Sequence, residues 1–155
     1  MSIGLVPPIS LRLADYRRLQ ELAALAGRDQ HPVADFLSTE VRRARVESDV
    51  SAGVVCLGRC ITYTVDGGLP VTRMLVHPQD YSGPKSDVSV LSPVGAALIG
   101  LRVRDRMPFI GLEGFHHEVA VLAVAGAATV VDFNLARRRR AYHGSGGFDP
   151  GPGAA

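Results

Sequence analysis

The amino-acid sequence predicts an α+β protein, in which a short antiparallel helical hairpin precedes an antiparallel β-sheet with one short helix. Two patterns lead to this fold class. Apolar residues recur every three or four positions over residues 14–46, as in amphipathic helices, and they alternate with polar residues farther along the chain, as in strands. A small polar stretch, residues 48–53, separates the two patterns. We therefore expect a helical unit over residues 1–48, a sheet-rich unit over residues 54–133 and a tail over residues 134–155.

The first unit is predicted to begin with a short extended segment over residues 9–13, where apolar and polar residues alternate. The apolar stripe of residues 14–26 then predicts an amphipathic helix, and Gly27 is expected to end it. After a short polar loop, Pro32 suits the first turn of a second helix, whose apolar stripe continues to about Val46. Two helices joined by so short a loop run antiparallel.

The second unit contains four predicted strands. Residues 61–65 and 71–77 form a β-hairpin by their alternation and by the Asp-Gly-Gly turn between them. Residues 106–110 and 116–124 are expected to form a second pair of strands. Because Pro108 has no N–H group to donate to a neighbouring strand, the strand that contains it is placed at an edge of the sheet.

A short helix is predicted between the two strand pairs. Ser92 is a favoured N-cap residue and Pro93 suits the first helical position, where a missing N–H costs nothing. Gly100 follows the apolar run of residues 96–99 and is expected to end the helix. The helix is thus about two turns long.

The charge of the chain is concentrated in its tail. Residues 10–49 carry seven Arg against seven acids, and residues 54–129 carry six basic side chains against six acids, so both segments are neutral. The net charge of +2 therefore comes from residues 130–155, where four arginines outweigh Asp132 and Asp149: Arg137, Arg138, Arg139 and Arg140. The two predicted units are not a basic clamp for nucleic acid. The Gly- and Pro-rich tail is expected to be disordered, either as a solvated appendage or with a weak nucleic-acid contact.

The two cysteines and the N-terminus indicate a reducing, cytoplasmic setting. Cys56 and Cys60 are four residues apart on extended chain, about 13 Å at the rise of a strand, whereas a disulfide needs Cα atoms within about 7 Å. We expect both to remain thiols. The prolines and charges near the start do not fit a signal peptide, and no apolar run is long enough to cross a membrane.

Residues 90–105 read VLSPVGAALIGLRVRD and resemble the S-P-x-G-x-A-L-x-G-x-x-x-x-D signature of the GreA/GreB-type transcription elongation factor family, most closely its Rnk-type members, the regulators of nucleoside diphosphate kinase. The order of elements over about residues 9–125 fits as well. The resemblance implies an N-terminal coiled coil and an FKBP-like C-terminal domain that docks at the rim of the secondary channel of RNA polymerase. It assigns the contact with polymerase to Ser92 and Pro93. Leu91 departs from some relatives, which have an acid there.

The expected tip of the helical hairpin lacks the chemistry of transcript cleavage. Relatives that cleave transcripts place acidic side chains at this tip, where they help to hold a metal ion. Here Asp29 is followed three residues later by Pro32 instead of a second acid, and a dozen helical residues reach only about 20 Å. We therefore expect no cleavage activity.

The sequence shows no catalytic or metal-binding pattern, so we expect a non-enzymatic protein without cofactor or metal. The family resemblance implies RNA polymerase as its partner, and we expect a monomer. His116 and His117 are adjacent on a strand, so their rings point to opposite faces and cannot bind one metal ion. An alternative is an FKBP-like peptidyl-prolyl isomerase or folding helper, but that activity needs a deep aromatic-lined pocket, for which the second unit offers Tyr63, Tyr81, Phe109 and Phe115 and no Trp. A third is a nucleic-acid-binding protein that acts through the arginine tail.

Overall fold

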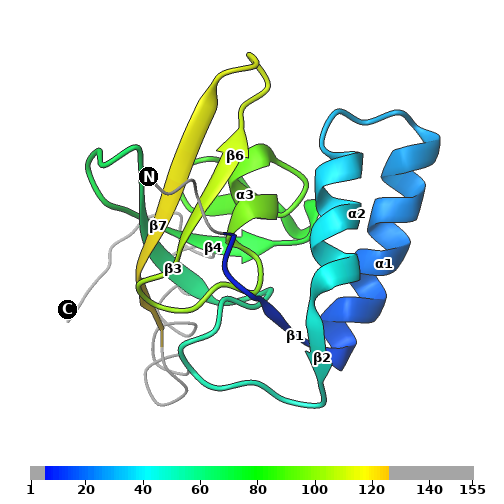
Figure 1. Ribbon diagram of the computed structural model, residues 1–155, viewed down its shortest axis with the longest axis horizontal. Helices are drawn as coiled ribbons and strands as arrows, with labels where there is room; N and C mark the ends of the chain where they lie inside the picture. The colour runs from blue at the N-terminus through cyan, green and yellow to red at the C-terminus, as the bar shows by residue number, and fades with distance from the viewer. Residues whose placement is uncertain (1–5, 126–155) are drawn as a thin grey trace. The chain divides into compact units, whose positions relative to one another are not determined.

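The computed structural model describes residues 6–125, which contain all the predicted helices and strands (Figure 1). The tail of residues 134–155, with its four arginines, lies outside the described residues. The α+β class is confirmed: a pair of helices lies beside a curled five-stranded sheet, and a third, short helix packs on that sheet.

The helical pair consists of α1 (Leu13–Arg28) and α2 (Ala34–Arg43), which lie side by side and are joined by a short loop. The prediction that Gly27 ends the first helix is wrong. The helix continues through Gly27, and Gln30 adopts the left-handed conformation, with φ of 57°. The N–H of His31 then donates to the carbonyl oxygen of Ala26 over 2.9 Å. One of the last carbonyl groups of the helix thereby gains a hydrogen-bond donor, and no glycine is needed at the turn.

The second helix is shorter than predicted, because its expected last residues form a strand. β2 (Arg45–Glu47) pairs in parallel with β1 (Ser10–Arg12), and the N–H of Arg45 donates to the carbonyl oxygen of Ile9 over 2.9 Å. The helix also begins at Ala34 instead of Pro32. Pairing with a distant segment therefore overrides the local helical pattern at this end.

The five strands of the main sheet lie in the order β5-β4-β3-β7-β6. Their bounds are β3 (Cys60–Val65), β4 (Val71–Val76), β5 (Asp87–Ser89), β6 (Arg106–Ile110) and β7 (His116–Val124). Neighbouring strands are antiparallel except for β4 and β5, which are parallel. β6 lies at an edge, as predicted from Pro108.

α3 (Pro93–Leu98) connects the helical pair to the sheet, since it contacts α2, β5, β6 and β7. Gly100 ends it with φ of 82°, as predicted. The same glycine also permits a close approach to β1, because a Cβ atom there would lie 2.7 Å from the Cβ atom of Ile9. One hydrophobic core includes buried residues of the helices, α3 and the sheet, among them Leu19, Leu37, Ile61, Leu98 and Val119.

A polar contact joins the start of α1 to the chain that precedes β3. The Arg12 guanidinium donates to both carboxylate oxygens of Asp15, each over 3.0 Å, and to the carbonyl oxygen of Leu57 over 2.9 Å. Asp15 in turn accepts a hydrogen bond from the N–H of Leu57. The helical pair is therefore tied to the sheet-bearing part by ionic and backbone contacts as well as by apolar packing.

The two cysteines are buried and no disulfide joins them, as predicted. Burial raises the pKa of the Cys56 thiol, so this side chain is held in its neutral form. In the described part of the chain, no helix has the length and apolar character that crossing a membrane requires.

Candidate partner-binding site

The turn that leads into α3 is held by its own hydrogen bonds. Ser92 caps the helix, because its Oγ accepts from the N–H of Gly95 over 3.0 Å, and the same hydroxyl donates to the carbonyl oxygen of Ser89 over 2.7 Å. The Oγ of Ser89 accepts from the N–H of Leu91 over 3.0 Å. The predicted N-cap is thus confirmed, and these bonds satisfy polar groups on both sides of the turn.

A glycine is required one turn into α3. A Cβ atom at Gly95 would lie 1.9 Å from the carbonyl oxygen of Ser89, so the helix and the turn pack backbone to backbone. The side chains that this arrangement leaves half-buried at the surface are Leu91, Ser92, Pro93 and Val94. The two residues assigned to partner contact, Ser92 and Pro93, are therefore neighbours on a hydrogen-bonded turn, where both are half-buried at the surface.

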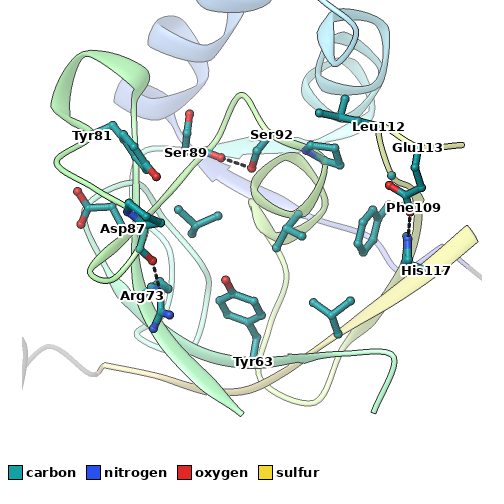
Figure 2. Close-up of a pocket in the computed structure, with 16 residues that line it drawn as sticks. Tyr63, Arg73, Tyr81, Asp87, Ser89, Ser92, Phe109, Leu112, Glu113 and His117 are labelled. Carbon is teal, nitrogen blue, oxygen red and sulfur yellow. Dashed lines mark hydrogen bonds and ion pairs between the residues drawn. The ribbon is translucent and has the colours of Figure 1, made fainter. Parts of the chain in front are cut away.

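A groove of about 600 Å³ lies beside this turn, and Figure 2 shows its residues. We call it the tyrosine groove. Its lining is mainly apolar and includes Tyr63, Tyr81, Val88, Val94, Phe109 and Leu112, with Ser92 and Pro93 also in contact with it. Burial raises the pKa of Tyr63, so its phenol remains neutral. The groove can accept an apolar side chain and offers it hydroxyl groups at the walls.

A second groove, of about 920 Å³, runs between α2 and β6. We call it the helix groove, and its apolar lining includes Val33, Phe36 and Met107. Pro93 and Phe109 line both grooves. Pro93 therefore occupies a position at which a partner could contact either groove.

His117 lies at the edge of the tyrosine groove between two carboxylates. Its Nδ1 is 2.6 Å from Oδ2 of Asp66, and its Nε2 contacts the carboxylate of Glu113. The ring also stacks on Phe109, with the ring centroids 5.3 Å apart. Hydrogen bonds with Asp66 and then Glu113 raise the pKa of His117, and their bonds to His117 lower the pKa values of both carboxyls. We call these three ionisable residues the His117 cluster.

The His117 cluster was not predicted from the sequence. The two adjacent histidines do differ in their surroundings, since His116 is exposed while His117 is engaged. No local pattern places Asp66, which is 51 positions away, or indicates that Glu113 reaches back across its own turn. The only available signal was an acid in each of the two turns that join the strands of the predicted pairs.

The other predicted site residues lie elsewhere. Asp29 is the exposed C-cap residue of α1 and lines neither groove. Tyr63, Tyr81 and Phe109 line the tyrosine groove, whereas Phe115 is exposed and does not. Within residues 6–125, no three His, Cys, Asp or Glu side chains are grouped so that they could hold a metal ion. Arg137 to Arg140 lie outside the described residues.

Comparison with known proteins gives consistent matches. Residues 50–125 match the family model described as the C-terminal part of the transcription elongation factors GreA/GreB. Regulators of nucleoside diphosphate kinase from Escherichia coli (strain K12) and Shigella flexneri are each 32% identical over 102 residues, which is 64% of this chain and 75% of theirs. A solved GreA/GreB elongation factor from Nitrosomonas europaea has a TM-score of 0.61 at 27% identity, covering 75% of this chain and 98% of that one. The family match includes the turn into α3 and most of the tyrosine groove.

Proposed function

The chain belongs to the GreA/GreB family of transcription factors, and on that premise we propose that it regulates transcription by binding RNA polymerase through the turn formed by residues 89–93. The family resemblance assigns this turn to the rim of the secondary channel of polymerase. The relatives that match are described as elongation factors and as regulators, which supports the same class of function.

One observation carries the proposal: the turn is fastened by hydrogen bonds of its own in the absence of any partner. The hydroxyl of Ser92 is bonded on both sides, and Gly95 packs directly against Ser89. A surface that is already in its bound conformation loses little entropy on binding. Pro93 adds a fixed backbone angle and an apolar ring between two grooves, which suits contact with an apolar segment of a partner.

We propose that this binding does not lead to transcript cleavage. α1 has 16 residues and α2 has 10, so the longer helix extends about 24 Å at 1.5 Å per residue. Asp29 stands at the end of this pair, and the next acid, Asp35, is in the first turn of α2, where it suits the helix dipole. The protein would then act by occupying the channel rim or by competing with other factors for it.

A prolyl-isomerase function is not proposed. The tyrosine groove has three aromatic side chains, but the family model and the matched relatives point to transcription factors, and no comparison supports a folding helper. A groove on a shared architecture is not evidence of the activity found elsewhere on it.

Affinity capture with the full chain as bait tests the proposal. The bait is immobilised and exposed to purified core RNA polymerase and, separately, to a bacterial lysate. The proposal predicts that polymerase subunits are retained in both cases. Folded bait that retains no polymerase from either source would contradict it.

A further inference from the structure

Three segments of the sheet-bearing part meet at His117. Asp66 directly follows β3, Glu113 lies in the turn between β6 and β7, and His117 is the second residue of β7. Figure 2 shows Glu113 and His117 on the same side of the tyrosine groove, with the ring of Phe109 beside them. One imidazole therefore links two turns that are distant in sequence.

The protonation state of the ring decides whether it can make both contacts. A charged imidazolium has two N–H donors, whereas a neutral imidazole has one donor and one acceptor. Both ring nitrogens of His117 face a carboxylate oxygen, which can only accept when ionised. Loss of one proton therefore leaves a nitrogen lone pair against a carboxylate, and one of the two contacts must break.

Asp66 is also bonded to the neighbouring strand β7, whereas the other hydrogen bond of the Glu113 carboxylate is to the backbone of its own residue. Oδ1 of Asp66 accepts from the N–H of Glu118 over 2.8 Å, and the N–H of Asp66 donates to the carbonyl oxygen of Glu118, also over 2.8 Å. The side chain of Glu113 instead folds over its own turn, so close to Gly111 that a Cβ atom there would lie 2.4 Å from Oε1. When the His117 ring loses a proton, the contact between His117 and Glu113 is therefore the one that breaks.

The turn that Glu113 holds is also part of the groove. Leu112 and Glu113 line the tyrosine groove, and Leu112 lines the helix groove as well. Phe109, which stacks on His117, lines both. Backbone bonds from Gly111 N–H to Phe115 O and from Gly114 N–H to Gly111 O close the turn on its own, so release of Glu113 removes its side-chain link to His117 at the rim of the groove.

The charged groups that face His117 come from each segment packed against it. The turn after β3 contributes Asp66, and the turn between β6 and β7 contributes Glu113. β6 presents the uncharged ring of Phe109, and its cation Arg106 is paired with Glu118 over 3.0 Å. On β7 itself the sequence neighbours of His117 are Glu118 and the exposed His116. The two charged groups that act on the His117 ring, Asp66 and Glu113, are both negative.

We propose that His117 acts as a pH-dependent switch of the tyrosine groove, which keeps the turn of residues 111–115 in place while the ring is protonated and releases it when the ring loses its proton. This inference rests on the proposed function, because it assigns regulation to the same docking site. The hydrogen bonds of the cluster raise the pKa of His117 above its ordinary value of about 6.5. The groove is thus ordered at lower pH and loosens as the pH rises through that raised value.

Nuclear magnetic resonance on the full chain tests the switch without any partner. The ring of His117 and the backbone amides of residues 111–115 are followed from about pH 5.5 to 9, which spans the titration of histidine. The proposal predicts that the amides move with the same midpoint as the ring. Glu113→Gln should lower the midpoint of His117 and uncouple the amides, whereas His116→Gln, the adjacent exposed histidine, should change neither. Amides that do not follow the ring, or a midpoint unchanged in Glu113→Gln, would overturn the proposal.

Affinity for core RNA polymerase, measured over the same pH range, tests its regulatory consequence. Binding of the unmodified chain should weaken about two- to tenfold as the pH rises, the change expected for ordering one or two side chains on binding. Glu113→Gln should flatten this dependence relative to His116→Gln. Equal pH dependence in the two variants would refute the regulatory role. Absence of binding at every pH would instead contradict the proposed function, while the resonance titration would still decide whether the switch exists.

Discussion

Gly95 lies directly against Ser89, so that a Cβ atom on the glycine would be 1.9 Å from the carbonyl oxygen of the serine. The turn into α3 and the first turn of the helix are therefore in backbone contact, with the Ser92 hydroxyl bonded to both sides. The surface proposed to bind polymerase depends on this contact, because a shift of the turn would move Pro93 relative to both grooves.

Gly95→Ala is expected to destabilise the protein. The new methyl group meets backbone, which cannot rotate away, so the free energy of unfolding should fall by about 1 to 3 kcal/mol or more, as for other overpacked sites. Urea denaturation measures this change. Gly27→Ala is the matched control, since Gly27 is helical with open space around it and should gain about 0.5 to 1 kcal/mol. Equal stability of the two variants would contradict the packing described.

Asp15→Ala is expected to loosen the helical pair from the sheet. The substitution removes both hydrogen bonds to Arg12 and leaves the N–H of Leu57 without this acceptor, at a cost of about 1 to 3 kcal/mol. Glu47→Ala, which removes an exposed ion pair to Arg45, should cost less than about 0.5 kcal/mol. Thermal unfolding compares the two. If both variants unfold at the same temperature, the Arg12–Asp15 contact does not fasten the helices.

Stability should depend on pH through the His117 cluster. The pKa of His117 is raised in the folded protein, so its contribution is fully present below its ordinary pKa of about 6.5 and is lost as the pH rises through the raised value. The pKa values of Asp66 and Glu113 are lowered, so their contribution is lost as the pH falls through those values. As the pH rises above neutrality, the thermal unfolding midpoint of the unmodified protein should therefore fall more steeply than that of His117→Gln. Parallel profiles of the two proteins would contradict this assignment.

Transcript cleavage is expected to be absent. Addition of the pure protein to a stalled, backtracked elongation complex should release no more short RNA than buffer does, because Asp29 has no acidic partner within its loop and the helices are short. Gel electrophoresis of the labelled transcript measures the product. Robust cleavage that disappears in Asp29→Ala would show that the tip reaches the active centre.

Much of the fold could be predicted because its signals are local. Ser92, Pro93 and Gly100 specify the ends of α3 within nine residues, and Pro108 alone places β6 at an edge. The errors arise where distant segments decide. The pairing of Arg45 with Ser10 converts the expected end of a helix into a strand, and no local pattern announces a partner 35 positions away.

The candidate site divides in the same way. The turn that carries Ser92 and Pro93 was predictable, since its capping chemistry lies within one short stretch of sequence. The groove beside it was not, because its walls come from β3, β6, the loop before β5 and the turn before β7. Gly27 shows a further limit: a glycine permits a helix to end but does not compel it, and Gln30 adopted the left-handed conformation instead.

The affinity of Pro93 variants for core RNA polymerase, measured alongside their thermal unfolding, tests the central claim most directly. Pro93→Ala keeps a good helix former and should cost only about 0.5 to 1 kcal/mol of stability. Pro93→Asp places a charged group in a contact that is expected to be apolar. Desolvation of an unpaired polar group costs about 1 to 3 kcal/mol, so the affinity for polymerase should fall about five- to a hundredfold. Unfolding of Pro93→Asp should remain cooperative. Unchanged affinity in folded Pro93→Asp would place the docking surface elsewhere and contradict the account.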